Sequence, residues 1–114
     1  MADPTTTDPD LYSVLFENDR VRVLQYRDRP GQGTSTHSHP DSVMVTLAAF
    51  SRRLRHGDRE VDVELEPFQA RWLDAQEHSG TNTGRTDSHA IFVELKEPRP
   101  DAAPERPRLG PSDS

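Results

Sequence analysis

GQGTSTHSHPDSV, residues 31–43, places two histidines one residue apart, between a Gly-Gln-Gly turn and a Pro-Asp pair. Alternate side chains of an extended strand share a face, so His37 and His39 are expected to project together while Ser38 points away. Two imidazoles with this spacing can reach one metal ion. The alternative is a solvated turn that happens to carry two histidines, because short motifs have many false matches.

A third histidine could join this pair from another strand. His78 lies between the segments WLDAQE and SGTNTG, well downstream of the pair. It can approach His37 and His39 only if the two strands are neighbours in the sheet. His56 lies in the turn sequence RHGDR and is expected to face solvent.

Short apolar segments separated by turn sequences surround these histidines. In VDVEL, residues 61–65, Val61, Val63 and Leu65 fall on one face and the two acidic residues on the other. Strands at this spacing predict an all-β sandwich or barrel. TLAAFSRRLR, residues 46–55, has helical propensity, but a lone helix would interrupt a run of hairpins, so strand-turn-strand is predicted there.

Charge and composition exclude several kinds of partner. The chain has 114 residues, a formal net charge of -6 and no cysteine. Without clustered Lys and Arg, neither nucleic acid nor a membrane surface is an expected partner. Disulfides and thiolate metal ligands are excluded by the missing cysteines. The pair Arg52-Arg53 is expected to keep a strand soluble, with binding of an anionic substrate as the alternative.

The two ends of the chain differ in composition from the middle. Residues 1–10 are rich in Asp, Thr and Pro and predict a flexible arm. Residues 11–96 are predicted to form one β-barrel domain. Residues 97–114 carry a proline every few positions and predict an extended or disordered tail. No signal-peptide pattern precedes the domain, so a cytoplasmic protein is expected.

Two motifs resemble those of the cupin superfamily. Gly31, five further residues and the His-x-His of residues 37–39 resemble the opening of the first cupin motif. His78, followed after three residues by Asn82, resembles the end of the second. The resemblance covers roughly residues 14–96 and implies a double-stranded β-helix, a jelly-roll barrel of two antiparallel sheets.

This resemblance implies that His37, His39 and His78 hold one divalent transition metal inside the barrel. The first motif usually adds a glutamate ligand where this sequence has Val43 and Met44. Three neutral ligands leave the metal its full charge and open positions, which suits anionic chelating substrates. Three-histidine iron sites in cupins are associated with thiol dioxygenation and diketone cleavage. Iron is therefore expected, with zinc, nickel and manganese as alternatives.

Further candidate site residues are less clearly marked. Asp41 and His89 are the candidate catalytic groups, although Asp41 follows a proline in a turn and His89 could instead be a strand-end histidine bonded to a turn or to water. Trp72 could be a core aromatic rather than a substrate contact. The predicted substrate pocket comprises Tyr26, Val43, Val45, Trp72, Gln76 and Asn82.

The leading hypothesis is a metal-dependent dioxygenase acting on a small chelating or anionic metabolite. Two alternatives remain open: a metal-dependent isomerase or lyase, and a non-catalytic small-molecule binding protein. A homodimer is also predicted, because Ile91 and Val93 are apolar on the face opposite Phe92, so one face can meet the core and the other a second copy.

Overall fold

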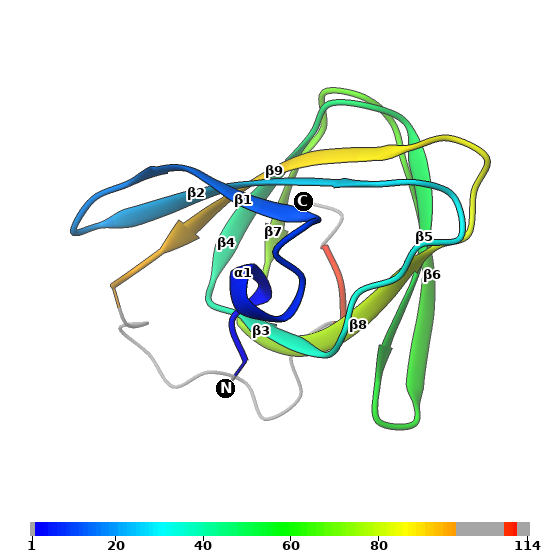
Figure 1. Cartoon of the computed structure of the whole chain (residues 1–114), viewed down its shortest axis with the longest axis horizontal. Coiled ribbons are helices and arrows are strands. Elements are labelled where there is room, and N and C mark those ends of the chain that lie inside the picture. Colours follow the sequence, from blue (N-terminus) through cyan, green and yellow to red (C-terminus); the bar gives the residue numbers. More distant parts are fainter. Residues whose placement is uncertain (1, 98–108, 112–114) are drawn as a thin grey trace.

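The computed structural model describes residues 2–97 and 109–111 and confirms an all-β chain. In these residues the regular elements are one short helix and nine strands (Figure 1). They are α1 Pro4–Thr7, β1 Tyr12–Glu17, β2 Val21–Asp28, β3 His37–His39, β4 Ser42–Thr46, β5 Phe50–His56, β6 Arg59–Leu65, β7 Ala70–Leu73, β8 Gln76–Asn82 and β9 Ser88–Leu95. Residues 46–55 form strand-turn-strand, as predicted.

The strands form two antiparallel sheets that enclose a common interior. One sheet has the order β1-β2-β9-β4-β7 and the other β3-β8-β5-β6. Figure 1 shows β2 and β9 running along one wall of the barrel and β5, β6 and β8 along another. Non-consecutive neighbours such as β9 and β4 make this the double-stranded β-helix that the sequence predicted.

The core lies between the two sheets. Its buried side chains alternate along the strands with side chains that face outward, as the pleat requires. In β9, for example, Ala90 and Phe92 are buried while Ile91 and Val93 are only partly covered. The core cluster comprises Tyr12, Leu24, Tyr26, Met44, Phe50, Leu65, Leu73, Ala90 and Phe92.

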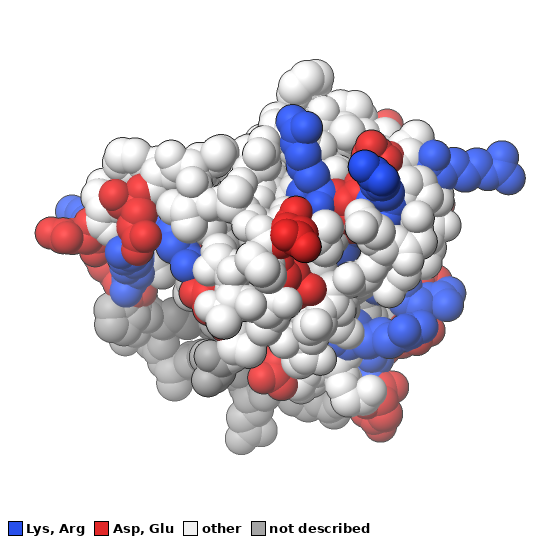
Figure 2. Space-filling view, viewed as in Figure 1, with Lys and Arg blue, Asp and Glu red and all other residues white. Residues whose placement is uncertain are grey.

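The outer faces of the two sheets differ in chemistry. On the five-stranded sheet, the register aligns Val23, Val93, Val43 and Trp72 in one row across four strands. On the four-stranded sheet, the outward side chains of β5 and β6 form exposed ion pairs, with Arg53 bonded to Asp62 at 2.7 Å. Figure 2 shows positive and negative side chains next to one another over this part of the molecule.

The N-terminal residues differ from the flexible arm that their composition predicts. Asp3 caps α1 by accepting from the Thr5 N–H at 2.8 Å and also forms an ion pair with Arg22 at 2.8 Å. Asp8 accepts from the Ser35 N–H at 3.1 Å. These polar contacts, together with the burial of Pro4, attach this segment to the barrel, and composition alone does not reveal them.

The predicted C-terminal tail falls mostly outside the described residues. Apart from residue 97, the described part of this tail is 109–111, which packs against the barrel rather than extending from it, and Leu109 is only 9% exposed. No helix in the described part of the chain has the length and apolar character needed to cross a membrane.

Candidate metal centre

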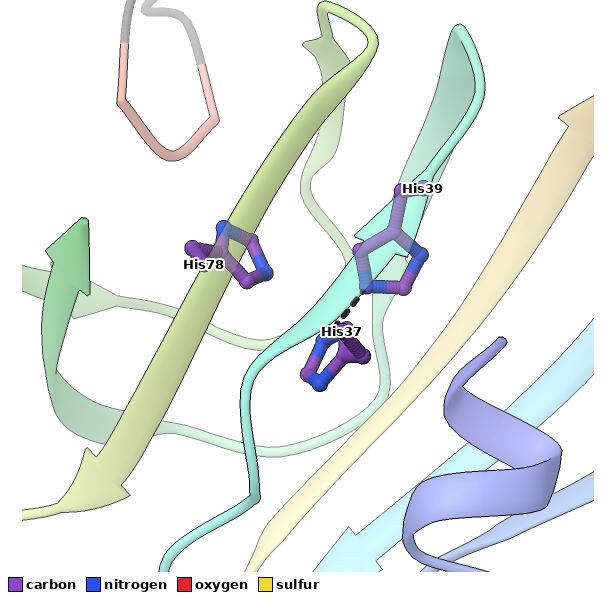
Figure 3. A group of neighbouring side chains, drawn as sticks. All are labelled: His37, His39 and His78. Carbon is purple, nitrogen blue, oxygen red and sulfur yellow. Dashed lines mark hydrogen bonds between the residues drawn. The ribbon is translucent and has the colours of Figure 1, made fainter. Parts of the chain in front are cut away.

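Three histidines converge in the barrel interior. Strands β3 and β8 pair antiparallel with His37 directly opposite His78, and His39 lies two residues further along on the same face. One ligand atom from each ring lies within 4.8 Å of the others, and all three residues are buried. Figure 3 shows the rings turned toward one another. The His37 and His39 Nε2 atoms lie 3.0 Å apart. The two strands are therefore neighbours, which is the condition for His78 to approach His37 and His39.

Each imidazole is oriented by a hydrogen bond on its far side. The Nδ1 atoms face oxygens that can only accept: the Ser35 carbonyl 2.8 Å from His37, the Gln76 amide oxygen 2.8 Å from His78, and the Glu94 carboxylate 3.2 Å from His39. Each Nδ1 can therefore donate a proton to the oxygen beside it, and in that tautomer the Nε2 lone pairs face the shared space. This is the arrangement that metal-binding histidines usually have.

The surroundings favour neutral imidazoles. Burial, with a further contribution from the neighbouring His39, lowers the pKa of His37 to about 4. Burial likewise lowers the pKa of His78 well below its usual value. Both rings are uncharged at neutral pH, and a neutral ring is the form that can donate its lone pair to a metal.

Glu94 is buried next to the three histidines, but it contacts His39 on the side of the ring that faces away from the shared space. Its carboxylate bonds to His39 Nδ1 and forms an ion pair with Arg22 at 2.8 Å. A carboxylate engaged in this way orients a ligand instead of acting as one. Sequence reasoning missed Glu94. The signal that could have found it is the alternation along β9, which places Glu94 on the same inward face as Ala90 and Phe92.

Among the described residues, the group that could hold a metal contains no carboxylate. Met44 is one of the inward-facing residues of β4 and lines the cavity beside the histidines. Val43, its neighbour, faces the other way. Of the two positions where the family usually has a glutamate, Met44 is therefore the one that faces the interior of this barrel.

A small, mostly apolar cavity of about 40 Å³ adjoins the histidines. His37 and His78 line it together with Tyr12, Tyr26, Phe92 and Arg52. The Tyr12 hydroxyl lies 3.5 Å from His37 Nε2, and burial raises the pKa of this phenol well above its usual value. Tyr12 thus remains protonated and can donate a hydrogen bond at the site.

Arg52 lies inside the barrel, in contrast to the expectation that it keeps a strand soluble. Its guanidinium bonds to the Asp28 carboxylate and lies over the ring of Tyr26, 4.9 Å from the centroid. Asp28 also accepts from the Tyr26 hydroxyl and, at 3.0 Å, from the Asn82 side-chain amide. Neighbouring residues of a strand point to opposite faces, so Arg52 of β5 faces the interior while Arg53 is exposed.

The predicted pocket residues divide into two groups. Tyr26 lines the cavity. Gln76 and Asn82 lie next to it: Gln76 forms a hydrogen bond with His78, and Asn82 donates one to Asp28. The other three, Val43, Val45 and Trp72, lie on the outer face of the five-stranded sheet. Their placement differs from the prediction because the pleat turns each of them away from the core.

The two candidate catalytic groups also lie outside the histidine cluster. Asp41 accepts from the Ala75 N–H at 2.9 Å and so connects two turns. His89 lies on the outward side of β9, between the inward Ser88 and Ala90, with its Nε2 2.9 Å from the Gln25 amide oxygen. Neither belongs to the group of ligands described above.

Solved structures share this architecture. A crystal structure of a cupin domain from Bordetella pertussis aligns with a TM-score of 0.71 and 26% sequence identity, covering 76% of this chain and 93% of that one. The chain has the fold of a small cupin.

Two more distant structures show the same fold as this cupin. A conserved protein with a double-stranded β-helix domain from Klebsiella pneumoniae aligns with a TM-score of 0.59 and 18% identity, covering 91% of this chain and 84% of that one. A cupin superfamily protein from Desulfitobacterium hafniense aligns with a TM-score of 0.52 and 21% identity, covering 74% and 76%. No protein-family model matches the cupin sequence, and no curated protein matches it significantly.

Proposed function

We propose that this cupin is a metal-dependent dioxygenase with iron at His37, His39 and His78, acting on a small chelating or anionic metabolite. The observation that carries the proposal is a set of three buried imidazoles without a carboxylate in the described ligand group. A neutral ligand set leaves the metal its full positive charge, so an anionic chelate is attracted to it.

The residues present fit a divalent metal. Three Nε2 atoms face one space while each Nδ1 is occupied by an acceptor. Bound there, iron would supply the electron transfer between substrate and oxygen. The protein would hold the ligands, surround the substrate with the apolar side chains of the core, and offer the Tyr12 hydroxyl as a hydrogen-bond donor.

A substrate screen tests this function. Iron-loaded protein would be mixed with β-diketones, thiols and hydroxy acids while oxygen uptake is recorded. We expect uptake with at least one chelating class. If no chelator causes uptake but zinc-loaded protein catalyses isomerisation or lyase turnover, the isomerase alternative replaces the dioxygenase. If neither metal supports a reaction, the binding-protein alternative is favoured.

Met44→Glu tests directly whether the missing carboxylate matters for this proposal. A glutamate at this inward position would lie beside the histidines, lower the net charge and occupy a coordination position. We expect iron to be retained, while oxygen uptake falls at least about tenfold because a two-point chelate can no longer be held in its reactive geometry. The uncharged Met44→Gln is the matched control. Equal oxygen uptake by the two variants would contradict the explanation.

We also propose that two copies pair through the outer face of the five-stranded sheet. The row of Val23, Val93, Val43 and Trp72 is apolar across four strands, whereas the opposite sheet is covered by ion pairs. A broad apolar face of this kind marks a protein contact surface. A twofold axis would bring the same face of two copies together.

Val93→Asp is expected to convert the dimer to a monomer, since it buries a charge at the centre of this face. Light scattering at micromolar concentration measures the mass. Ser79→Asp is the matched control, because Ser79 faces outward on the four-stranded sheet. A monomeric wild type would refute the dimer.

A further inference from the structure

The C-terminal residues 109–111, here called the strap, occupy a site built for them. Leu109 and Gly110 are buried, and the Gly110 N–H donates to the Gln76 side-chain oxygen at 2.9 Å. Gly110 has φ +83°, and a Cβ there would lie 2.7 Å from Leu54 Cδ1. The backbone conformation therefore favours glycine, and a larger residue would also have to displace the Leu54 side chain. In Figure 3 the strap is the pale red segment on the His78 side of the cluster.

The strap separates two cavities. The inner one, of about 40 Å³, contains His37 and His78 in its wall. The outer one, of about 760 Å³, runs along β6 at the surface and is lined partly by Leu109. Val63, Leu65 and Pro111 line both cavities. The two spaces are therefore neighbours, and Pro111 of the strap lies in the wall of each.

The inner cavity is too small for a metabolite while the strap is in place. Its volume of about 40 Å³ is close to the roughly 30 Å³ that one water molecule occupies in the liquid. Sites for small organic ligands usually enclose about 300 Å³ or more. Something in the wall must move before a substrate can reach the histidines, and the strap is a part of the wall that belongs to neither sheet.

We propose that the strap is a gate: it closes the route from the surface cavity along β6 to the three histidines, and it must lift before a ligand can enter. The identity of that ligand rests on the proposed metal-dependent function, whereas the closure itself does not.

Gln76 connects the gate to the centre. Its side-chain oxygen accepts from both His78 Nδ1, at 2.8 Å, and the Gly110 N–H. An amide oxygen has two lone pairs, so it can serve both donors at once. When the strap lifts, the oxygen loses one donor and keeps the other. Gln76 is therefore a positioning residue shared by the strap and a candidate metal ligand.

Chemical modification of the histidines tests the gate without any metal. Metal-free protein would be treated with diethyl pyrocarbonate, and the rate at each histidine read by mass spectrometry. His37 and His78 report the inner cavity, while His56 and His89 lie outside it and serve as internal controls. In the wild type we expect the two inner histidines to react at least about tenfold more slowly than His56, in keeping with their burial.

Two full-length variants make the comparison specific. Gly110→Ala should speed modification of His37 and His78 by about fivefold or more, because alanine is disfavoured in the left-handed backbone that the strap requires. Gly57→Ala is the matched control, since Gly57 has φ +60° in the β5–β6 turn with nothing within 4 Å of an added Cβ. It should leave both rates unchanged. A chain ending at residue 108 should react faster still, and one ending at residue 111 like the wild type.

The outcomes separate the gate from the proposed function. If Gly110→Ala and the chain ending at residue 108 both leave the rates at His37 and His78 unchanged, the strap is not a gate. Cobalt(II) titration of the same proteins, followed by visible absorption, provides the second readout. Faster modification together with no cobalt binding would support the gate and overturn the proposed metal centre.

Discussion

His78→Ala is expected to lower the affinity for iron(II) or zinc more than about 100-fold, beyond the roughly 10–100-fold that follows loss of an outer hydrogen-bond partner. The reason is direct: the variant removes one of three convergent Nε2 donors. His37→Ala should have the same effect. Elemental analysis after dialysis would measure it, with about one metal ion per chain expected for the wild type.

The chain supplies its own controls for this experiment. His56→Ala and His89→Ala remove histidines that lie outside the cluster and should leave the metal content unchanged. Circular dichroism would verify that each variant is folded. If His37→Ala and His78→Ala both retain a full equivalent of metal, the three histidines are not the site.

Asp28→Asn is expected to lower the free energy of unfolding by about 3 kcal/mol, in the range for breaking a buried ion pair. The Asp28 side chain is fully inaccessible and Arg52 is 11% exposed, so the variant leaves the guanidinium buried without its counter-charge. Urea denaturation at pH 7 measures the change. Asp62→Asn breaks the exposed pair with Arg53 and should leave stability nearly unchanged.

The pH dependence of this difference provides a second check. Burial would raise the pKa of Asp28, but hydrogen bonds from Tyr26 and Ser88 and the charge of Arg52 outweigh it and hold the pKa below its usual value. The folded carboxylate therefore stabilises the protein fully above about pH 4, its usual pKa, and this contribution is lost as the pH falls further. The stability gap between wild type and Asp28→Asn should narrow in that acidic range. A gap that stays constant down to pH 3 would contradict the assignment.

The fold and the histidine cluster could be predicted because both depend on local patterns. Alternation along a strand places His37 and His39 on one face, and the motif resemblance supplied His78 as the third member. The phase of β4 could not be predicted in the same way. The turn at Pro40 and Asp41 shifts the alternation, so Ser42 and Met44 face inward and Val43 faces outward.

The polar groups around the cluster were beyond prediction for a different reason. Arg52 and Glu94 appear in the sequence as ordinary charged strand residues, and their burial depends on Asp28 and Arg22, which approach them only in the folded barrel. The strap was missed because proline-rich composition predicts an extended tail. Its burial arises from contacts with Leu54 and Gln76, which are distant in sequence.

The shortness of β3 makes the centre depend on the beginning of the chain. This three-residue strand carries two of the three histidines and is the outermost strand of its sheet, with β8 on one side only. On its open side the Ser38 N–H donates to the Ala2 carbonyl at 2.7 Å. Proteolytic trimming or a fused affinity tag at the N-terminus would thus disturb His37 and His39 together, whereas β8, which carries His78, stays paired with β5 through residues 79–82.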